Sequence, residues 1–321
     1  MSQVQDGTLP TNSGHLGSAR DLYLTEYGGA VESQFAKSSI MRQFVTIRPV
    51  RGTNTLQNNR VGKTTLAKVT PGVRPGAERV KFGTVQVTVD TIIIARDNVD
   101  RLDVFQSNFD HRAEIGTDHG KEIGKFFDEA FLIKVIHGAQ ATPADTLDGA
   151  FGSGKEGTLV DTIATGLTDA DKFEKTIRAL LVEFEEEDIE LDEFLIMMRP
   201  AEYSALLDAG KLMDSDFTAG NDFAAGTMRQ IYGTNVMKTA RIPRSANLSH
   251  LLGDAYNITA KDARAAAVIL HPRSLLAGET IPLTSDVYYD RKELQWFIDS
   301  HLAFGVNVNR EDLCGAVFFA S

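Results

Sequence analysis

Two groups of residues in this sequence have the side-chain types that could do chemistry. The first, Gly62-Lys63-Thr64-Thr65, has the composition of the end of a nucleotide phosphate-binding loop. That motif needs a glycine five residues before Gly62, where the sequence has Gln57. It also needs a buried strand before it and a helix after it, and the polar, proline-containing flanks predict neither. An NTPase is therefore kept only as the weakest alternative.

The second group holds the possible metal ligands His111, Asp118, His119 and Glu122. Two histidines eight residues apart lie about 80° apart around a helix, so only the two carboxylates share a face. A metal site needs several convergent ligands, and a solvated helix start is the favoured interpretation. No serine or cysteine forms a recognisable triad motif with the remaining histidines. We therefore predict no catalytic, cofactor-binding or metal-binding residue.

The composition narrows the class of protein. The chain has 321 residues, 42% of them hydrophobic, which is enough for a real core. Its one cysteine, Cys314, excludes a disulfide scaffold and is expected to be a small buried apolar residue. The polar residues 1–20 contain no secretory signal, and no apolar run approaches the roughly 18 residues that cross a bilayer. A net charge of −11 argues against a protein whose main surface grips nucleic acid.

Residues 51–81 differ most from the rest of the chain. They contain no aromatic residue and combine seven basic residues with one acid, Glu78. The stretch is therefore at +6, and because the chain is at −11 the remainder is at −17. A basic segment without a core of its own, in an acidic protein, is expected to lie on an acidic neighbour, most simply a second copy of the chain.

The flanks of this stretch predict a long two-armed β-hairpin. Turn signals occur at Gly52, Gly62, Pro71-Gly72 and Pro75-Gly76. Residues 80–94 alternate β-branched residues with Thr and Gln, which indicates one continuous strand. Arms of about 20 residues would reach about 65 Å, whereas a compact chain of this length has a radius of gyration near ~20 Å. The tip is expected to overhang its own subunit.

Helices and strands are predicted on both sides of the hairpin. Residues 1–20 are typical of a flexible tail, 21–40 of a helix interrupted at Gly28-Gly29, and 44–49 of a strand. A helix of about 42 Å is expected over 108–138. Three glycines at every fourth position of that helix indicate a close backbone crossing, which we expect to be against a sheet. They are Gly116, Gly120 and Gly124.

The second half mixes helices and strands, which makes the fold class α+β. We expect a helix capped by Asp169 or Asp171, a second helix at 201–209 and a loop at 213–228. The expected strands are a short one within 139–168, one at 194–198, a pair at 230–239 around Gly233, and four more at 268–270, 281–289, 295–309 and 315–320. The last two are separated by a turn at 310–312. The final strand is expected to be tied into a sheet.

Residues 183–193 are the most acidic stretch, with eight carboxylates among eleven residues. They lack the glycine and ligand spacing of a calcium-binding loop. The plain interpretation is a solvated helix end and loop. The alternative is an acidic patch that meets basic residues of a neighbouring copy, because charges at an interface rim steer assembly. The candidate intersubunit residues are Arg51, Arg60, Lys63, Lys68, Arg74, Arg79, Glu183, Glu185, Glu186 and Glu187.

The order of these elements, an N-terminal arm, a basic hairpin, a long helix, an α/β middle and closing strands, resembles the Hong Kong 97-type shell fold of tailed-phage major capsid proteins. Four stretches are similar to capsid proteins of short-tailed podophages of the T-seven group. They are LYLTEYGGAVESQFAKSS (22–39), PAEYSALL (200–207), MRQIYGTNVMKTARIP (228–243) and GVNVNREDLCGAVF (305–318). In the last one Asn309-Arg310-Glu311-Asp312 replaces an expected Arg-Pro-Glu run, so that turn matches only approximately.

The resemblance covers most of residues 20–320 and implies a division of the chain. Residues 1–45 would form an N-terminal arm, 46–95 the extended hairpin loop, and 96–150 a peripheral domain with the long helix as its spine. Residues 151–285 would form the axial domain around hexamer and pentamer centres. Residues 286–321 would return to the peripheral domain as closing strands.

The role implied by the resemblance is assembly and not catalysis. The chain would form hexamers and pentamers of an icosahedral shell, in the virion and built in the host cytoplasm. It would enclose double-stranded DNA without sequence-specific binding, with a scaffolding protein, a portal and a decoration protein as partners. Some relatives join subunits covalently, for which Lys63 or Lys68 with Asn307 or Asn309 would be the candidates. The main alternative is an encapsulin-like nanocompartment shell.

Overall fold

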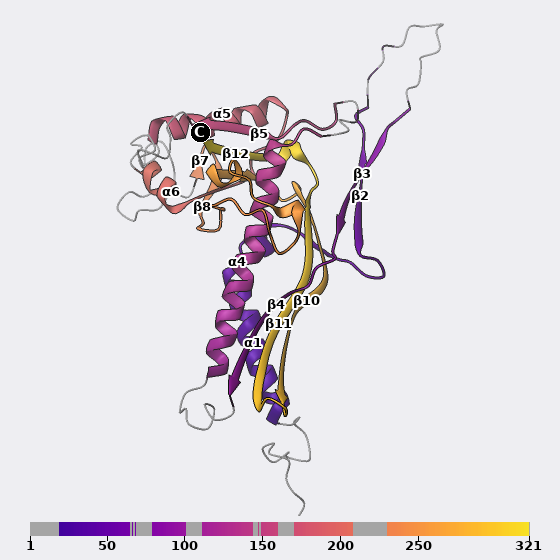
Figure 1. Cartoon of the computed structure of the whole chain (residues 1–321). Coiled ribbons are helices and arrows are strands. Elements are labelled where there is room, and N and C mark those ends of the chain that lie inside the picture. The colour runs from indigo at the N-terminus through magenta and orange to yellow at the C-terminus, as the bar shows by residue number, and fades with distance from the viewer. Residues whose placement is uncertain are drawn as a thin grey trace, which may run out of the picture.

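The computed structural model describes residues 19–64, 66, 68, 79–100, 111–143, 147, 149–159, 170–207 and 230–320. Helix α4 (His111–Gln140) runs along most of an elongated body (Figure 1). A six-stranded sheet lies at one end of this helix, and a four-stranded sheet extends along the rest of it. A two-stranded hairpin projects from the side of the body. The predicted long helix is confirmed, as is the α+β class.

The four-stranded sheet is built on two long antiparallel strands. Leu275 pairs with Val308 at one end of this ladder, and Asp290 pairs with Gln295 at the other. In spatial order the strands are β1 (Ile47–Pro49), β10 (Leu275–Asp290), β11 (Gln295–Val308) and β4 (Ile93–Asp100). Proline in β1 is tolerated because β1 is an edge strand, where the missing N–H costs no ladder bond.

The six-stranded sheet is covered on both faces. In spatial order its strands are β5 (Lys155–Leu159), β12 (Cys314–Phe319), β9 (Ala265–Leu270), β6 (Leu195–Met198), β8 (Thr234–Lys238) and β7 (Gln230–Ile231). Leu195 and Met197 pack into the same core cluster as α4, whereas Ile196 and Met198 pack with α5 (Ala170–Glu186) and α6 (Pro200–Leu207). Burial on both faces explains why β6 is a continuous apolar run.

Strand β12 lies inside the six-stranded sheet, which confirms the prediction that the last strand is paired within a sheet. It pairs with β5 on one side, Gly315 opposite Lys155, and with β9 on the other, Cys314 opposite Leu270. The predicted division had grouped residues 286–321 with the peripheral strands. The hydrogen-bond ladders instead place β11 in one sheet and β12 in the other, so the boundary of the six-stranded unit falls between them.

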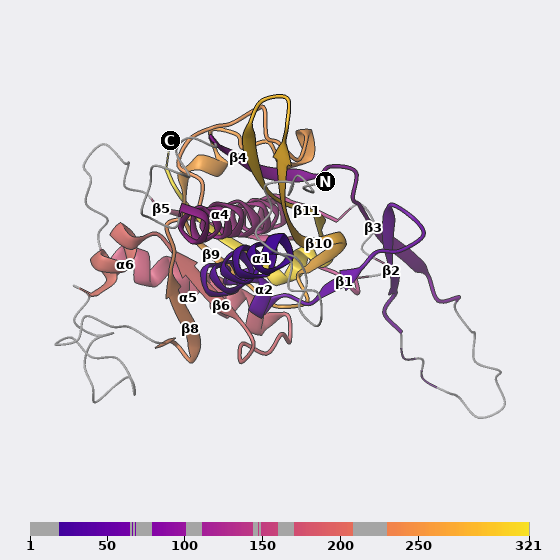
Figure 2. The same ribbon diagram turned by 90° about the horizontal axis from the view of Figure 1, so that it is seen from below.

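Helix α1 (Ala19–Ser38) lies against α4 along its glycine stripe, and Figure 2 shows the two helices side by side. A Cβ at Gly120 would stand 2.7 Å from the carbonyl oxygen of Val31, and one at Gly116 would stand 2.9 Å from the ring of Tyr27. The predicted close crossing is real, but its partner is a helix and not a sheet. The helix is also unbroken at Gly28-Gly29, because packing against α4 outweighs a helix propensity cost of about 1 kcal/mol per glycine.

A carboxylate from α4 decides the conformation after α1. Asp128 is buried and accepts hydrogen bonds from the backbone N–H groups of Ile40 (2.9 Å) and Met41 (3.2 Å) and from the Ser39 hydroxyl (2.7 Å). It thereby caps α2 (Met41–Phe44), and an ion pair with Arg241 balances its charge. The strand predicted at 44–49 is therefore confined to Ile47–Pro49.

The strand predicted over 80–94 is two strands in different sheets. Strand β3 (Phe82–Thr88) belongs to the hairpin, and β4 pairs with β11, with Ile93 opposite Leu302. The chain turns away from the hairpin after Val89, which is buried between them. Alternation of apolar residues continues across this junction, so the sequence pattern could not reveal it.

The remaining elements agree with the sequence predictions. These are the short strand before α5, helices α5 and α6, the strand pair around Gly233, and strands β9 to β12. The described residues also contain three single-turn 3₁₀ helices: Asp254–Tyr256, Asp262–Arg264 and Glu311–Leu313. Of the tail predicted at 1–20, residues 19 and 20 belong to α1 and the rest lies outside the described residues, as does the loop predicted at 213–228. Of the two candidate caps, Asp171 lies inside α5 and Asp169 is outside the described residues.

The close contact between α1 and α4 predicts that alanine substitutions at two glycines change the free energy of unfolding in opposite directions. Gly120→Ala should lower the free energy of unfolding by about 1–3 kcal/mol, because its methyl group would overlap the Val31 carbonyl. Gly29→Ala meets no atom within 4 Å and should raise it by about 0.5–1 kcal/mol. Urea denaturation of both variants measures the difference. Equal effects would show that the crossing is not tightly packed.

Candidate intersubunit hairpin

The hairpin consists of β2 (Thr55–Val61) and β3, paired antiparallel from Thr55 opposite Thr88 to Val61 opposite Phe82. This confirms the predicted hairpin over its described part. Backbone bonds continue just beyond the strands, from Gly62 N–H to the Lys81 carbonyl (2.9 Å) and from Lys63 N–H to the Leu147 carbonyl (3.2 Å). The first links the two arms, and the second attaches the hairpin to the body.

One face of the hairpin base is packed against the four-stranded sheet. Val87 and Val89 are buried with Leu276 and Ala303, and Leu56 and Val85 pack around them. Gly305 of β11 permits this approach, because a Cβ there would stand 2.7 Å from the Thr88 carbonyl oxygen. The base is thus a fixed part of the subunit.

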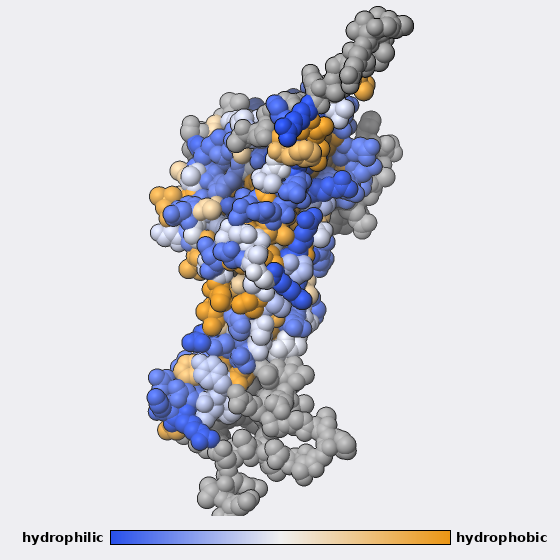
Figure 3. All heavy atoms as spheres, turned by 90° about the vertical axis from the view of Figure 1, so that its right-hand side faces the viewer, coloured by the Kyte–Doolittle hydropathy of each residue, from blue (hydrophilic) through white to orange (hydrophobic). Residues whose placement is uncertain are grey.

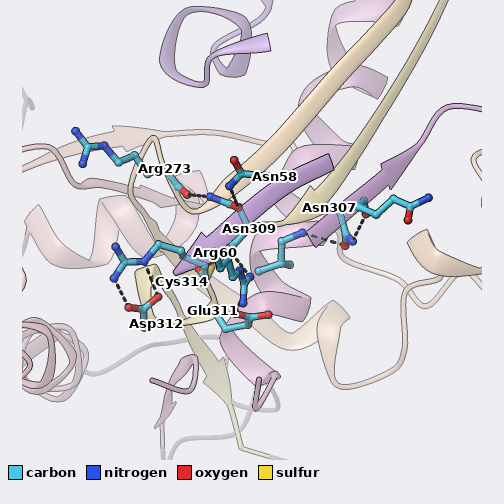
Figure 4. Close-up of polar contacts among 11 residues, drawn as sticks. Asn58, Arg60, Arg273, Asn307, Asn309, Glu311, Asp312 and Cys314 are labelled. Carbon is cyan, nitrogen blue, oxygen red and sulfur yellow. Dashed lines mark hydrogen bonds and ion pairs between the residues drawn. The ribbon is translucent and has the colours of Figure 1, made fainter. Parts of the chain in front are cut away.

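Arg60 locks the hairpin to the turn between β11 and β12 (Figure 4). Its side chain is only 9% exposed, and its guanidinium forms an ion pair with Glu311 at 3.1 Å. The same group donates to the Asn309 carbonyl and lies 5.1 Å from the ring centroid of Phe151. A buried arginine needs such a set of partners, since an unpaired buried charge is very costly.

Asparagine side chains extend this lock. Asn58 donates to the Asn309 side-chain oxygen (2.8 Å), and the Asn309 amide donates to the Arg273 carbonyl (3.0 Å). Asn307 donates to the backbone carbonyl of Gln86 in β3 (2.9 Å), as Figure 4 shows. Asn307 of β11 and Asn309 just after that strand therefore hold the base of their own chain's hairpin.

Cys314 lies directly behind this turn. It is fully buried, and burial raises the pKa of its thiol far above the ordinary range, which disfavours a thiolate. The prediction of a small buried cysteine is confirmed.

A buried lysine lies under the hairpin base. Lys134 of α4 lines a hollow of about 380 Å³ together with Gln86 and Asn307. Its ammonium donates to the Ala255 carbonyl (2.8 Å) and lies 4.3 Å from the ring centroid of Tyr256. Burial lowers the pKa of Lys134 to about 8, because the charged ammonium loses hydration.

Beyond its base the hairpin exposes apolar side chains. Val61 is 55% exposed and its cross-strand partner Phe82 is 71% exposed. Leu66 and Val80 nearby are also exposed. Figure 3 shows apolar and strongly polar residues together where the hairpin leaves the body. Exposed apolar residues grouped on a projecting element are typical of an interaction surface.

The candidate basic residues differ in position. Arg51, Lys63, Lys68 and Arg79 are exposed, whereas Arg74 lies outside the described residues. Arg60 is committed to Glu311 within its own chain, so its predicted intersubunit role is replaced by an intrachain one. Sequence reasoning missed this, because only the fold brings Glu311 to Arg60.

The candidate acidic residues lie on and just after the last turn of α5. Glu183, Glu185, Glu186 and Glu187 are all exposed. Glu187 pairs with Lys155, and Glu193 pairs with His271 at 3.1 Å. The stretch is thus an exposed acidic helix end, and the structure does not bring it together with the basic hairpin residues.

The other candidate chemistry finds no support in the described geometry. Val61 ends a strand, and the residues described after it form no helix that could bind phosphate. His119 is buried, with Tyr27 Oη at 2.8 Å and an Asp97 carboxylate at 3.0 Å, whereas Asp118 and Glu122 face solvent. Within the described ranges no three His, Cys, Asp or Glu side chains group as metal ligands. Nor does any helix in those ranges have the length and apolar character to cross a bilayer.

Comparison with known proteins gives a consistent set of relatives. The major capsid protein of Enterobacteria phage T3 is 25% identical over 254 residues, which span 75% of this chain and 73% of the relative. The minor capsid protein of that phage matches at the same identity over 58% of its length. No protein-family model matches the chain.

Solved structures extend the comparison. A chain of the bacteriophage PhiM1 mature capsid is 30% identical and superposes with a TM-score of 0.78, covering 88% of this chain and 87% of that one. The capsid of cyanophage P-SCSP1u superposes with a TM-score of 0.80 at 14% identity, covering 88% of each chain. A virus-like particle of Pyrococcus furiosus shares the fold at a TM-score of 0.54 and 13% identity.

A long spine helix, two sheets and a hairpin that projects from the body define the Hong Kong 97-type class of shell-forming proteins, and the fold comparisons place this chain in it. At 30% identity over most of both chains, the relation to the PhiM1 capsid chain is closer than fold alone. The chain belongs to the bacteriophage capsid protein family.

The Arg60 lock predicts a large and local effect. Arg60→Ala leaves Glu311 half-buried without its partner and should lower the free energy of unfolding by about 3 kcal/mol. Hydrogen exchange should accelerate in β2 and β3 before it does in β6 or β9. Arg51→Ala removes an exposed arginine from the same stretch and should change neither. Unchanged exchange in Arg60→Ala would contradict the lock.

Lys134 predicts a specific pH dependence. Its folded pKa of about 8 lies below the ordinary 10.5, so between these values the unfolded chain binds a proton that the folded chain does not. The free energy of unfolding should therefore rise with pH across this window, whereas below pH 8 the full cost of burying the charge is present. Lys134→Met should abolish that rise. Denaturant titrations of both proteins test it, and parallel pH curves would refute it.

Proposed function

We propose that the protein is the major capsid protein of a tailed bacteriophage and forms the icosahedral head shell from hexamers and pentamers. The observation that carries this proposal is the 30% identity to a mature phage capsid chain over nearly the whole fold. The major capsid protein of phage T3 supports the same role. Its place is then the capsid of the virion.

The hairpin is the proposed intersubunit element. Its base is fixed by Arg60 and by the apolar cluster around Val87, while the residues beyond the strands expose cations and apolar side chains. We infer that Arg51, Lys63, Lys68 and Arg79 lie on an acidic neighbouring subunit, with Arg74 as a further candidate. The exposed acids Glu183, Glu185, Glu186 and Glu187 are the proposed complement. Single exposed ion pairs contribute only about 0–1 kcal/mol, so their role is to set register.

The division into parts is proposed in the same terms. Residues 1–45 form the arm, 46–95 the hairpin loop, 96–150 the peripheral domain with α4, and 151–285 the axial domain. Strand β12 is added to the six-stranded unit, although 286–321 otherwise closes the peripheral domain. A scaffolding protein, a portal, a decoration protein and double-stranded DNA inside the shell are the proposed partners. An acidic subunit suits a wall along which DNA phosphates must slide.

The covalent alternative is disfavoured by the geometry. Asn307 and Asn309 hold the hairpin of their own chain through Gln86 and Asn58. An isopeptide bond to Lys63 or Lys68 of a neighbour would have to break these contacts. Particles that dissociate wholly to monomer on a denaturing gel would agree with this expectation.

Charge reversal on the hairpin tests the assembly role. Lys63→Glu with Lys68→Glu should leave a soluble, folded subunit and reduce the yield of shells at least about tenfold, because two attractive contacts per subunit edge become repulsive. Electron microscopy and sedimentation measure the yield. The matched control, Lys175→Glu with Lys292→Glu, changes the net charge equally at exposed sites away from the hairpin. Normal shells from the hairpin variant would contradict the proposal.

The nanocompartment alternative makes a separate prediction. Its support here is a shared fold with the Pyrococcus furiosus particle at 13% identity. Particles isolated from an infected host should protect DNA from nuclease if they are phage heads, and should contain protein cargo if they are compartments.

A further inference from the structure

A second exposed surface lies away from the hairpin, where α4 meets the segment after β8. A hollow of about 530 Å³ is lined there by Ile40, by Lys125 and Glu129 of α4, and by residues 238–244. The lining contains four cations, Lys125, Lys238, Arg241 and Arg244, and one carboxylate. Such a basic site is unexpected in a chain with a net charge of −11.

Two of these cations are available to a ligand. Lys125 is paired with Glu122, and Arg241 is paired with Asp128. Lys238 and Arg244 are exposed and have no ion-pair partner among the described residues, although Lys238 also lies 5.6 Å from the ring centroid of Tyr203. Behind them the buried Arg199 donates to the carbonyls of Pro243 and Ala263 (2.7 Å), which adds positive charge beneath the hollow.

A rigid loop with two exposed leucines comes shortly after residue 244 in the sequence. We call residues 247–258 the leucine loop. Leu248 and Leu251 are each 69% exposed. Asn247 and Ile258 form a two-bond backbone bridge (2.9 and 2.7 Å) across the loop.

Side chains satisfy the loop backbone from within. The Asn247 side chain accepts from Ser249 N–H (3.0 Å), and His250 Nδ1 accepts from Leu252 N–H (3.2 Å). The His250 ring stacks on Phe126 of α4 at 5.3 Å. The loop is therefore anchored one residue from Lys125, beside the hollow, and holds its leucines in solvent.

We propose that the hollow together with Leu248 and Leu251 binds an acidic amphipathic segment of a partner protein. Free cations select carboxylates, and fixed leucines next to them select an apolar face on the same segment, as in helix-in-groove recognition. Both features are needed, because surface charge alone gives steering without much affinity. The proposal rests on the proposed function only in expecting that a shell protein has partners.

Two other occupants fit the surface less well. A nucleic acid backbone would use the cations but would leave the two leucines exposed. The acidic stretch 183–193 of a second copy offers carboxylates, but Phe184, Ile189 and Leu191 within it pack into their own core. Neither supplies acid and apolar groups on one face.

Binding of designed probes to the full-length protein tests the inference. The main probe is a labelled helical peptide of about four turns, with Leu at i, i+3, i+4 and i+7 spacing and Glu elsewhere. A scrambled peptide of the same composition, polyglutamate and a short DNA duplex are the comparisons. Anisotropy should show binding of the amphipathic peptide that weakens as salt is raised, and at least about tenfold weaker binding of the other three.

Variants locate the binding. Leu248→Ser with Leu251→Ser should weaken binding at least about tenfold. Lys238→Gln with Arg244→Gln should weaken it and flatten its salt dependence. Leu294→Ser and Lys292→Gln alter another exposed leucine and lysine, at the β10–β11 turn, and should leave binding unchanged. All the substituted residues are exposed, and a thermal melt of each variant checks its folding.

Four results would overturn the proposal. They are equal binding by the scrambled peptide, no binding at all, DNA binding that depends on Lys238 and Arg244 but not on the leucines, and loss of shell formation by the leucine variant without any peptide. The last would make the surface a contact between copies. Normal shells that fail to bind the peptide would refute this inference and leave the proposed capsid function intact.

Discussion

A two-stranded hairpin has too little surface to be stable alone, and this constraint organises the rest of the subunit. Isolated two-stranded sheets are marginal in water, so one face of the hairpin must be covered. The body covers it at the base through Val87, Val89 and the Gly305 approach. Arg60 then fixes the last residues of β2 by a buried ion pair. The residues described just beyond β2, among them Lys63 and Leu66, have exposed cationic and apolar side chains.

The sequence revealed the elements better than their partners. The spine helix, the acidic helix end, the strand pair around Gly233 and the closing strands follow from periodicity, because each carries its own apolar pattern. Interactions between distant residues carry no local signature. Asp128 caps a helical turn that takes Phe44 out of the predicted strand, and Tyr27 and Val31 keep a helix intact through two glycines. The glycine stripe on α4 predicted a crossing, but spacing alone does not say what crosses.

The same limit applies to the candidate site. Composition identified a basic stretch and predicted an acidic partner for it, and most of its described residues are exposed. It could not separate Arg60 from the others, because only the fold brings Glu311 and Asn309 to it. The sequence did not show that Val61 and Phe82 would form an exposed pair, because Phe82 lay within a stretch predicted as one continuous strand. Beyond the strand pair predicted to end at residue 239, no element was predicted as far as residue 251, and nothing in that sequence indicates a rigid loop beside a basic hollow.

The position of β12 has a consequence for how the subunit is made. Strand β5 pairs with a strand that leaves the ribosome long after it, since Lys155 lies opposite Gly315. The turn just before β12 also supplies Glu311 and Asn309, the acceptors for Arg60. During synthesis the hairpin therefore emerges early but is fastened late. Until that turn is translated, a nascent chain lacks the acceptors that bind Arg60 and fix the base of its hairpin.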